Sequence, residues 1–150
     1  MRPIHILLVE DNEGDIFMTI EALEERRIIN KISVVYDGKA AIDFLEQKGI
    51  YNKVSLPDLI LLDINLPKLN GHEVLKYIKC NEKLKHIPVI ILTTSSSERD
   101  INQSYQHHAN CFITKPVEAD NFLKVVSGIE NYWVSIVTLI DDDKENISLN

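Results

Sequence analysis

Short, uniformly apolar runs alternate along the chain with longer segments in which apolar residues recur at helical spacing. A continuous run of a few apolar residues is typical of a strand buried on both faces. Apolar residues three or four positions apart instead mark one face of a helix. The pattern predicts five strands, at 4–9, 31–36, 57–62, 88–93 and 111–114.

A helical segment follows each predicted strand. After the first strand, apolar residues within 16–23 share one helix face, and Asn12 suits the N-cap. Glu13 and Asp15 suit the positive end of this helix. Further helices are predicted around 41–45, at 71–80, at 97–108 and at 116–132. Five strand–helix units in one domain imply a parallel sheet with helices on both faces.

Polar residues stand where four of the predicted strands end. They are Glu10 and Asp11, Asp63, Thr93 and Thr94, and Lys115 with Pro116. Each has an ordinary explanation on its own, because acids commonly end strands and Lys-Pro commonly forms a turn. The carboxyl ends of parallel strands, however, share one edge of the sheet, where ligands bind in such folds. Together these residues predict a site at that edge.

The residue types at this edge suggest phosphoryl chemistry. Three carboxylates close together repel one another and need a cation, and carboxylate and carbonyl oxygens select a hard ion such as Mg²⁺. One of the acids could act as a nucleophile and form an acyl phosphate. The metal and Lys115 would neutralise charge on the transferred group, and Thr93 offers a hydroxyl donor.

Composition narrows the class of protein. The 150 residues correspond to about one domain. With 16 basic and 23 acidic residues, the net charge of −7 argues against nucleic acid as the main partner. Cys80 and Cys111 make no metal pattern and fit a reducing compartment. His107 and His108 are expected to be surface residues. The sequence shows no signal peptide and no membrane-spanning run, so we expect a cytoplasmic protein.

The motifs VED, LLDINLP, ILTTS and ITKP together resemble the receiver domain of two-component response regulators over about residues 4–131. The resemblance implies a flavodoxin-like three-layer fold with a five-stranded sheet of order 2-1-3-4-5. It also implies that Asp63 accepts a phosphoryl group from a histidine kinase. The protein is then expected to be a signalling module rather than an enzyme, although it would promote its own Mg²⁺-dependent phosphorylation and dephosphorylation.

The same resemblance implies a role for each site residue. Glu10, Asp11 and Asp63 would hold Mg²⁺, with the backbone carbonyl of Asn65 as a further ligand. Glu10 stands where the family more often has aspartate, which is a tolerated change.

The resemblance also assigns the residues that would contact the phosphate. Thr93 would bind a phosphoryl oxygen and Lys115 would pair with the phosphate. Phe112 falls where the family places a switch aromatic, usually tyrosine, but it lacks the hydroxyl, so a switch role and a core role both stay open. Thr94 stands where alanine is frequent. The Lys115–Pro116 bond is commonly cis in this family.

Two other functions fit the predicted topology less well. Phosphatases that form an aspartyl phosphate carry a second aspartate as acid and base two residues later, where this chain has Asn65. Flavin-binding electron carriers need a glycine- and threonine-rich loop after the first strand, and the acidic segment 10–15 would repel a flavin phosphate.

The end of the chain suggests partners. Residues 1–132 are predicted to form the receiver domain, and 133–150 an extension with an apolar run at 133–140 and an acidic tail at 141–150, without an output domain. Residues 107–139 resemble the small stand-alone regulators of cyanobacterial and bacterial phytochrome kinases. This favours a phytochrome-type kinase partner. It also favours a homodimer through the fourth helix, fifth strand, fifth helix and extension, although the apolar run could instead fold back on its own domain.

Overall fold

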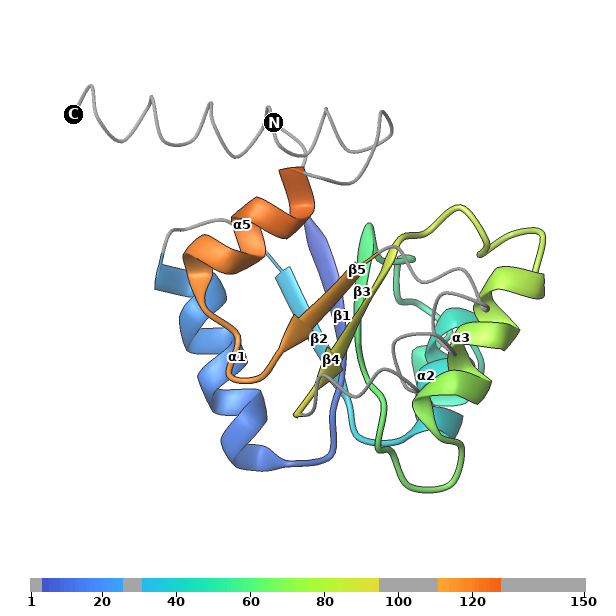
Figure 1. The fold of residues 1–150 in the computed structure, drawn as a ribbon. Coiled ribbons are helices and arrows are strands. Elements are labelled where there is room, and N and C mark those ends of the chain that lie inside the picture. Colours follow the sequence, from blue (N-terminus) through green and yellow to red (C-terminus); the bar gives the residue numbers. More distant parts are fainter. Residues whose placement is uncertain (1–3, 26–30, 95–110, 128–150) are drawn as a thin grey trace.

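In the computed structural model, which describes residues 4–25, 31–94 and 111–127, five parallel strands form one sheet. The strand order is β2-β1-β3-β4-β5, as Figure 1 shows, so the predicted flavodoxin-like order is confirmed. The strands are β1 (His5–Val9), β2 (Lys31–Val35), β3 (Leu59–Asp63), β4 (Val89–Thr93) and β5 (Cys111–Thr114). Each lies within two residues of its predicted limits.

Helices cover both faces of the sheet. They are α1 (Glu13–Glu25), α2 (Gly38–Leu45), α3 (Gly71–Cys80) and α5 (Ala119–Ser127), with a short 3₁₀ turn, η1 (Gly49–Tyr51). Helices α1 and α5 lie on one face, and α2 and α3 lie on the other (Figure 1). The helix predicted at 97–108 and the segment 133–150 lie outside the described residues, as does the predicted last helix beyond 127. Within the described part of the chain, no helix has the length and apolar character to cross a membrane.

The core consists of two apolar clusters, one on each face of the sheet. Successive strand residues point to opposite faces. Leu61 accordingly packs with the cluster that contains Phe122 of α5, whereas Leu62 packs with the cluster that contains Leu75 of α3. Every residue of β1 and β3 is buried. This two-sided burial is the reason that these strands appear in the sequence as unbroken apolar runs.

Polar side chains fix the starts of the helices near the carboxyl edge of the sheet. The Asp37 carboxylate accepts a hydrogen bond from the Ala40 N–H at 2.7 Å, and Asn70 accepts one from the Glu73 N–H at 3.0 Å. Before α1, Asn12 Oδ1 accepts from the N–H of Asp15 at 2.9 Å, which matches the predicted N-cap. These contacts satisfy backbone donors that the first turn of a helix leaves free.

Gly71 lets α3 begin directly against the end of β3. A Cβ atom at this position would lie 2.6 Å from the Cα of Ile64 and 3.1 Å from the carbonyl carbon of Asp63. Only a residue without a side chain permits this approach. The backbone around Asp63 is therefore held in place by the helix that follows it.

Candidate functional site

The structure brings the predicted polar residues together at one edge of the sheet. Glu10 follows β1, Asp63 ends β3, Thr93 ends β4 and Lys115 follows β5. The strand register places these ends side by side: Val9 pairs with Leu62, Asp63 pairs with Leu92, and Thr93 pairs with Thr114. The prediction that strand-end residues converge is thus confirmed for the described residues.

Three carboxylates form the centre of the site. One carboxylate oxygen from each of Glu10, Asp11 and Asp63 lies within 4.8 Å of the others. Glu10 is 0% exposed and Asp63 is 5% exposed, whereas Asp11 faces solvent. An all-oxygen donor set of this kind suits a hard divalent cation.

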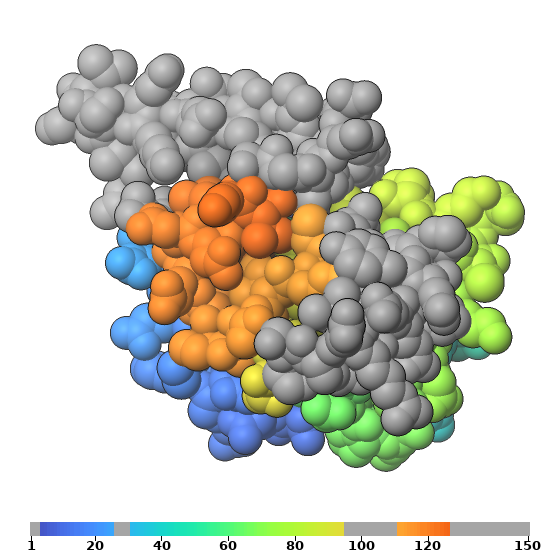
Figure 2. Space-filling view, in the orientation of Figure 1, coloured from blue at the N-terminus to red at the C-terminus, as the bar shows by residue number. Residues whose placement is uncertain are grey.

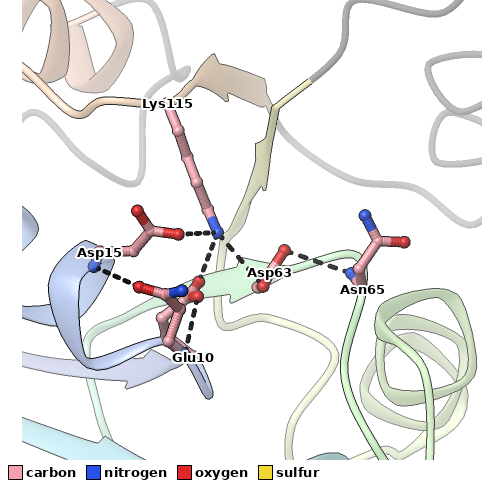
Figure 3. A network of polar contacts seen from close by, with 6 residues as sticks. Glu10, Asp15, Asp63, Asn65 and Lys115 are labelled. Carbon is pink, nitrogen blue, oxygen red and sulfur yellow. Dashed lines mark hydrogen bonds and ion pairs between the residues drawn. The ribbon is translucent and has the colours of Figure 1, made fainter.

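The Lys115 ammonium lies among these carboxylates (Figure 3). Its Nζ is 2.8 Å from Glu10 Oε2 and 3.2 Å from Asp63 Oδ2, and its side chain is 8% exposed. Burial alone would lower the pKa of Lys115, but hydrogen bonds to Glu10 and Asp15 and the charge of Asp63 together raise it. Lys115 therefore stays positively charged and partly balances the carboxylates.

Glu10 is the carboxyl group that is most affected by its surroundings. Burial raises its pKa from 4.5 to about 7; the Lys115 hydrogen bond opposes the rise and the Asp63 charge adds to it. Without a metal, the site therefore holds a proton on Glu10 through the mildly acidic range. A divalent cation binding here must displace that proton, which couples metal affinity to pH.

Asp15 also belongs to the site, although the sequence indicated only that it suits a helix start. Its Oδ2 accepts a hydrogen bond from Lys115 Nζ at 3.1 Å (Figure 3). The Asn12 side chain holds the backbone of Asp15 in the first turn of α1. A signal was present, because α1 begins where β1 ends and its first turn must face the same edge. The contact between Asp15 and Lys115 could not be predicted from the sequence, because the two residues are 100 positions apart.

Backbone groups position the carboxylates. The N–H of Asn65 donates to Asp63 Oδ1 at 3.2 Å, and the N–H of Asn12 donates to Glu10 Oε1 at 3.3 Å. The Asn65 side chain is exposed. Its predicted role through the backbone carbonyl stays a prediction.

The remaining predicted residues lie on β4 and β5 or directly after them. Thr93 is buried at the end of β4, and Thr94 beyond it is exposed. Phe112 is half-buried and packs against the apolar cluster under α2 and α3. The Lys115–Pro116 bond is cis, as the family resemblance implied. The roles of Thr93 and Phe112 in a switch stay predictions.

The fold and the site define a class of protein. A doubly wound parallel sheet carries a buried carboxylate cluster and a lysine at its carboxyl edge, which suits a protein that holds a divalent cation and a phosphoryl group. The sequence model of the response regulator receiver domain matches residues 6–127, and the chain belongs to this family.

Similar proteins agree with this assignment. Response regulator Rcp1 of Synechocystis sp. is 47% identical over 137 residues, which cover 91% of this chain and 93% of Rcp1. The crystal structure of the phosphorylated cyanobacterial phytochrome response regulator RcpA has a TM-score of 0.75 at 46% identity, covering 89% of this chain and 96% of RcpA. The Mn²⁺-bound form of Rcp1 has a TM-score of 0.73 at 46% identity, covering 88% and 95%. The chain is therefore a receiver-domain signalling protein, and the phosphatase alternative is not favoured.

Proposed function

We propose that this receiver domain accepts a phosphoryl group on Asp63 from a histidine kinase and signals through protein contacts. The observation that carries the proposal is the 3.2 Å contact between Lys115 Nζ and Asp63 Oδ2 within the carboxylate cluster. It puts Asp63, the residue that ends β3 at the edge of the sheet, beside both a fixed cation and a metal-type donor set. Similarity to RcpA, which was crystallised in a phosphorylated form, supports it.

The reaction is a substitution at phosphorus. A carboxylate oxygen of Asp63 attacks the phosphorus of a phosphohistidine, the P–N bond breaks, and the imidazole leaves with the bonding electron pair and takes up a proton from solvent. Asp63 becomes an acyl phosphate, and hydrolysis by water returns the carboxylate and releases inorganic phosphate. The 3.2 Å contact between Lys115 Nζ and Asp63 Oδ2 supports the proposal that Lys115 pairs with a phosphoryl oxygen when the acyl phosphate forms.

Mg²⁺ is the proposed cation. Glu10, Asp11 and Asp63 would hold it together with the backbone carbonyl of Asn65, and the bound ion would supply positive charge to the phosphoryl oxygens. The buried Glu10 carboxylate, which has an oxygen within 4.8 Å of carboxylate oxygens of Asp11 and Asp63, supports this donor set. The Mn²⁺-bound form of the similar protein Rcp1 supports a divalent ion in general.

Phosphorylation of Asp63 would change the conformation of residues on β4 and β5. The buried Thr93 lies at the end of the strand next to Asp63, where its hydroxyl could bind a phosphoryl oxygen. Thr93 and the half-buried Phe112 lie on the neighbouring strands β4 and β5, so a movement of Thr93 would reach Phe112 through the pairing of these two strands. Such a change would shift an equilibrium between two arrangements rather than create a new one.

We further propose the partners. Similarity to Rcp1 and RcpA favours a phytochrome-type histidine kinase as the donor and a cytoplasmic location. We propose a homodimer through the fourth-helix, β5 and α5 face extended by 133–150, with 1–132 as the receiver domain. The predicted fourth helix and the extension lie outside the described residues, so the evidence for the dimer is the sequence alone.

Labelling with a small phosphodonor tests the proposal. Acetyl phosphate with Mg²⁺ should add one acid-stable, base-labile phosphate to the wild-type chain and none to Asp63→Asn. Intact-mass and peptide mass spectrometry would locate it. A phosphate that persists in Asp63→Asn would refute the assignment of Asp63.

A further inference from the structure

Lys79, in the last turn of α3, is the only lysine besides Lys115 that is not fully exposed in the part of the chain that the structure describes. Its Nζ donates to the backbone carbonyl of Ile87 at 2.7 Å and to that of Lys85 at 3.2 Å. Both carbonyls belong to the segment between α3 and β4, at the edge of the sheet opposite to the phosphoacceptor site. Figure 2 shows α3 and this segment, in yellow-green, at the surface of the molecule. Lys79 is half-buried there and keeps some contact with solvent.

No carboxylate balances the charge of Lys79. Among the described residues its Nζ forms no ion pair, whereas the Nζ of Lys115 contacts three carboxylates. Burial therefore acts without an opposing charge and lowers the pKa of Lys79 to about 8. A lysine in water has a pKa of about 10.4, so its neutral form is scarce near pH 7. About a tenth of Lys79 is neutral at that pH, and only a neutral amine has a lone pair that can attack carbon.

The two carbonyl groups also orient the neutral amine. A neutral amine has two N–H bonds and one lone pair, and the carbonyls of Lys85 and Ile87 can accept both N–H bonds. The lone pair, which the carbonyl oxygens repel, then points away from them. The carbonyls are fixed by the fold, because the Lys85 N–H donates to Asn81 O at 2.8 Å and the Ile87 N–H donates to Leu84 O at 2.9 Å. Lys79 can therefore lose its charge without leaving an N–H unpaired, and its lone pair stays available to a reagent.

We propose that Lys79 is an acylation site, at which the amine takes the acyl group of a small acyl phosphate. The nitrogen attacks the carbonyl carbon, the bond from that carbon to the phosphate oxygen breaks, and phosphate leaves with the bonding electron pair. The nitrogen loses a proton to solvent, so the products are an amide and inorganic phosphate.

Local charge favours an anionic reagent of this kind. Residues 71–88 contain four lysines and only two glutamates, in a chain whose net charge is −7. A local excess of positive charge raises the concentration of a small anion beside Lys79. An acyl thioester offers the same carbonyl chemistry, and the experiment below separates the two donors. The proposal does not depend on phosphorylation of Asp63, which would use the phosphorus end of an acyl phosphate rather than its carbonyl carbon.

Acetylation of the full chain by acetyl phosphate tests the proposal, with the rate at each lysine measured by mass spectrometry of peptides. The exposed Lys76, one turn earlier on α3, is the control within the same molecule. At pH 7 the rate at Lys79 should exceed that at Lys76 by roughly tenfold, because a larger fraction of the Lys79 amine is neutral. The Lys79 rate should level off above about pH 8, whereas the rate at an exposed amine should go on rising. Equal rates at the two lysines, or a Lys79 rate without a plateau, would overturn the proposal.

Further arms assign the effect to the fold and to the reagent. In urea that unfolds the chain, Lys79 and Lys76 should react within about twofold of each other, since the burial that distinguishes them is lost. Lys79→Arg should remove the fast acetylation, and Lys76→Arg should leave it unchanged. Fast acetylation of Lys79 by acetyl coenzyme A but not by acetyl phosphate would overturn the choice of donor. Asp63→Asn should be acetylated at Lys79 at the wild-type rate, and the amide should survive the alkaline treatment that removes an acyl phosphate. This result separates the modification from the proposed phosphorylation.

Discussion

The two helical faces of the sheet use their charged side chains differently. On the α2 and α3 side, charges are paired locally: Lys68 Nζ lies 3.5 Å from Asp37 Oδ2, and Lys85 Nζ lies 2.9 Å from Glu82 Oε2. On the α1 and α5 side, the Lys115 ammonium points inward to the carboxylates of Glu10, Asp15 and Asp63. The ion pairs of the first face lie at the surface, whereas those of the second gather around Lys115 at the edge of the sheet, where we propose that the cation and the phosphoryl group bind.

Two lysines with little exposure, Lys115 and Lys79, make this difference between the faces testable. Lys115 faces carboxylates, whereas Lys79 of α3 donates to the backbone carbonyls of Lys85 and Ile87 at 3.2 and 2.7 Å. Burial lowers the pKa of Lys79 to about 8, but the surrounding acids raise that of Lys115. Lys79 is thus a half-buried donor to backbone carbonyls on one face, whereas Lys115 is a counter-ion to carboxylates on the other.

The largest expected effect is that of Lys115→Ala. Without Mg²⁺, the free energy of unfolding should fall by roughly 3–5 kcal/mol, because the carboxylates lose their counter-charge. Lys79→Ala should cost roughly 1.5–3 kcal/mol through the lost hydrogen bonds. Added Mg²⁺ should recover part of the first loss and none of the second. Urea unfolding with Mg²⁺ or with a chelator measures both. A loss in Lys115→Ala that does not depend on Mg²⁺ would contradict the proposed metal site.

The second prediction concerns the pH dependence of Mg²⁺ binding. Because burial holds the pKa of Glu10 at about 7 in the metal-free protein, Mg²⁺ must displace a proton below that pH. The association constant should therefore rise by about tenfold per pH unit up to pH 7 and then level off. Isothermal titration calorimetry between pH 5.5 and 8 would check this. Glu10→Gln should bind more weakly and without this slope, and a flat wild-type profile would refute the assignment of the proton to Glu10.

The sequence was sufficient for the fold and for the main members of the site. Strands buried on both faces must be apolar throughout, so β1, β3 and β4 were visible as runs. The acids at the ends of β1 and β3 and the lysine after β5 had to meet at the edge that parallel strands share. The parallel order followed from the family resemblance rather than from periodicity, since periodicity does not determine which strands are neighbours.

Other features of the site depended on three-dimensional packing. The Asp15–Lys115 contact joins residues that are far apart in sequence, and nothing in the local pattern of α1 distinguishes Asp15 from an ordinary first-turn acid. The raised pKa of Glu10 depends on complete burial at the end of β1, which a sequence position does not reveal.

The third prediction, with a smaller expected effect, compares the N-cap of α2 on one face with that of α1 on the other. Asp37→Ala removes the cap of α2 and should lower the free energy of unfolding by about 1 kcal/mol, without an effect on labelling by acetyl phosphate. Asn12→Ala removes the equivalent contact at α1 and should cost a similar amount. It should also slow labelling, because it loosens the turn that holds Asp15 against Lys115. Equal labelling rates in the two variants would show that Asp15 does not contribute to the site.

The smallest expected effect comes from the opposite end of β1. His5 is 5% exposed; its Nε2 lies 2.8 Å from Ser33 Oγ, and its Nδ1 lies 3.3 Å from Ser55 Oγ. Burial and then the charge of Lys31 lower the pKa of His5 below 6.5, although Asp58 and the backbone at Leu56 oppose the shift. The folded protein therefore takes up a proton here less readily than the unfolded chain does.

The signs of the two titrations at the ends of β1 are opposite. His5, with a lowered pKa, contributes stability that is lost as pH falls from 6.5 toward its folded-state pKa. Glu10, with a raised pKa, makes the metal-free protein less stable as pH rises from 4.5 to about 7. Saturating Mg²⁺ should displace the Glu10 proton and so remove the contribution of Glu10 to the pH dependence of stability. The remaining His5 contribution should make the free energy of unfolding rise with pH below 6.5. His5→Gln, which can still bond to both serines, should flatten that rise in urea unfolding at fixed Mg²⁺. An unchanged slope in His5→Gln would assign the dependence to another group.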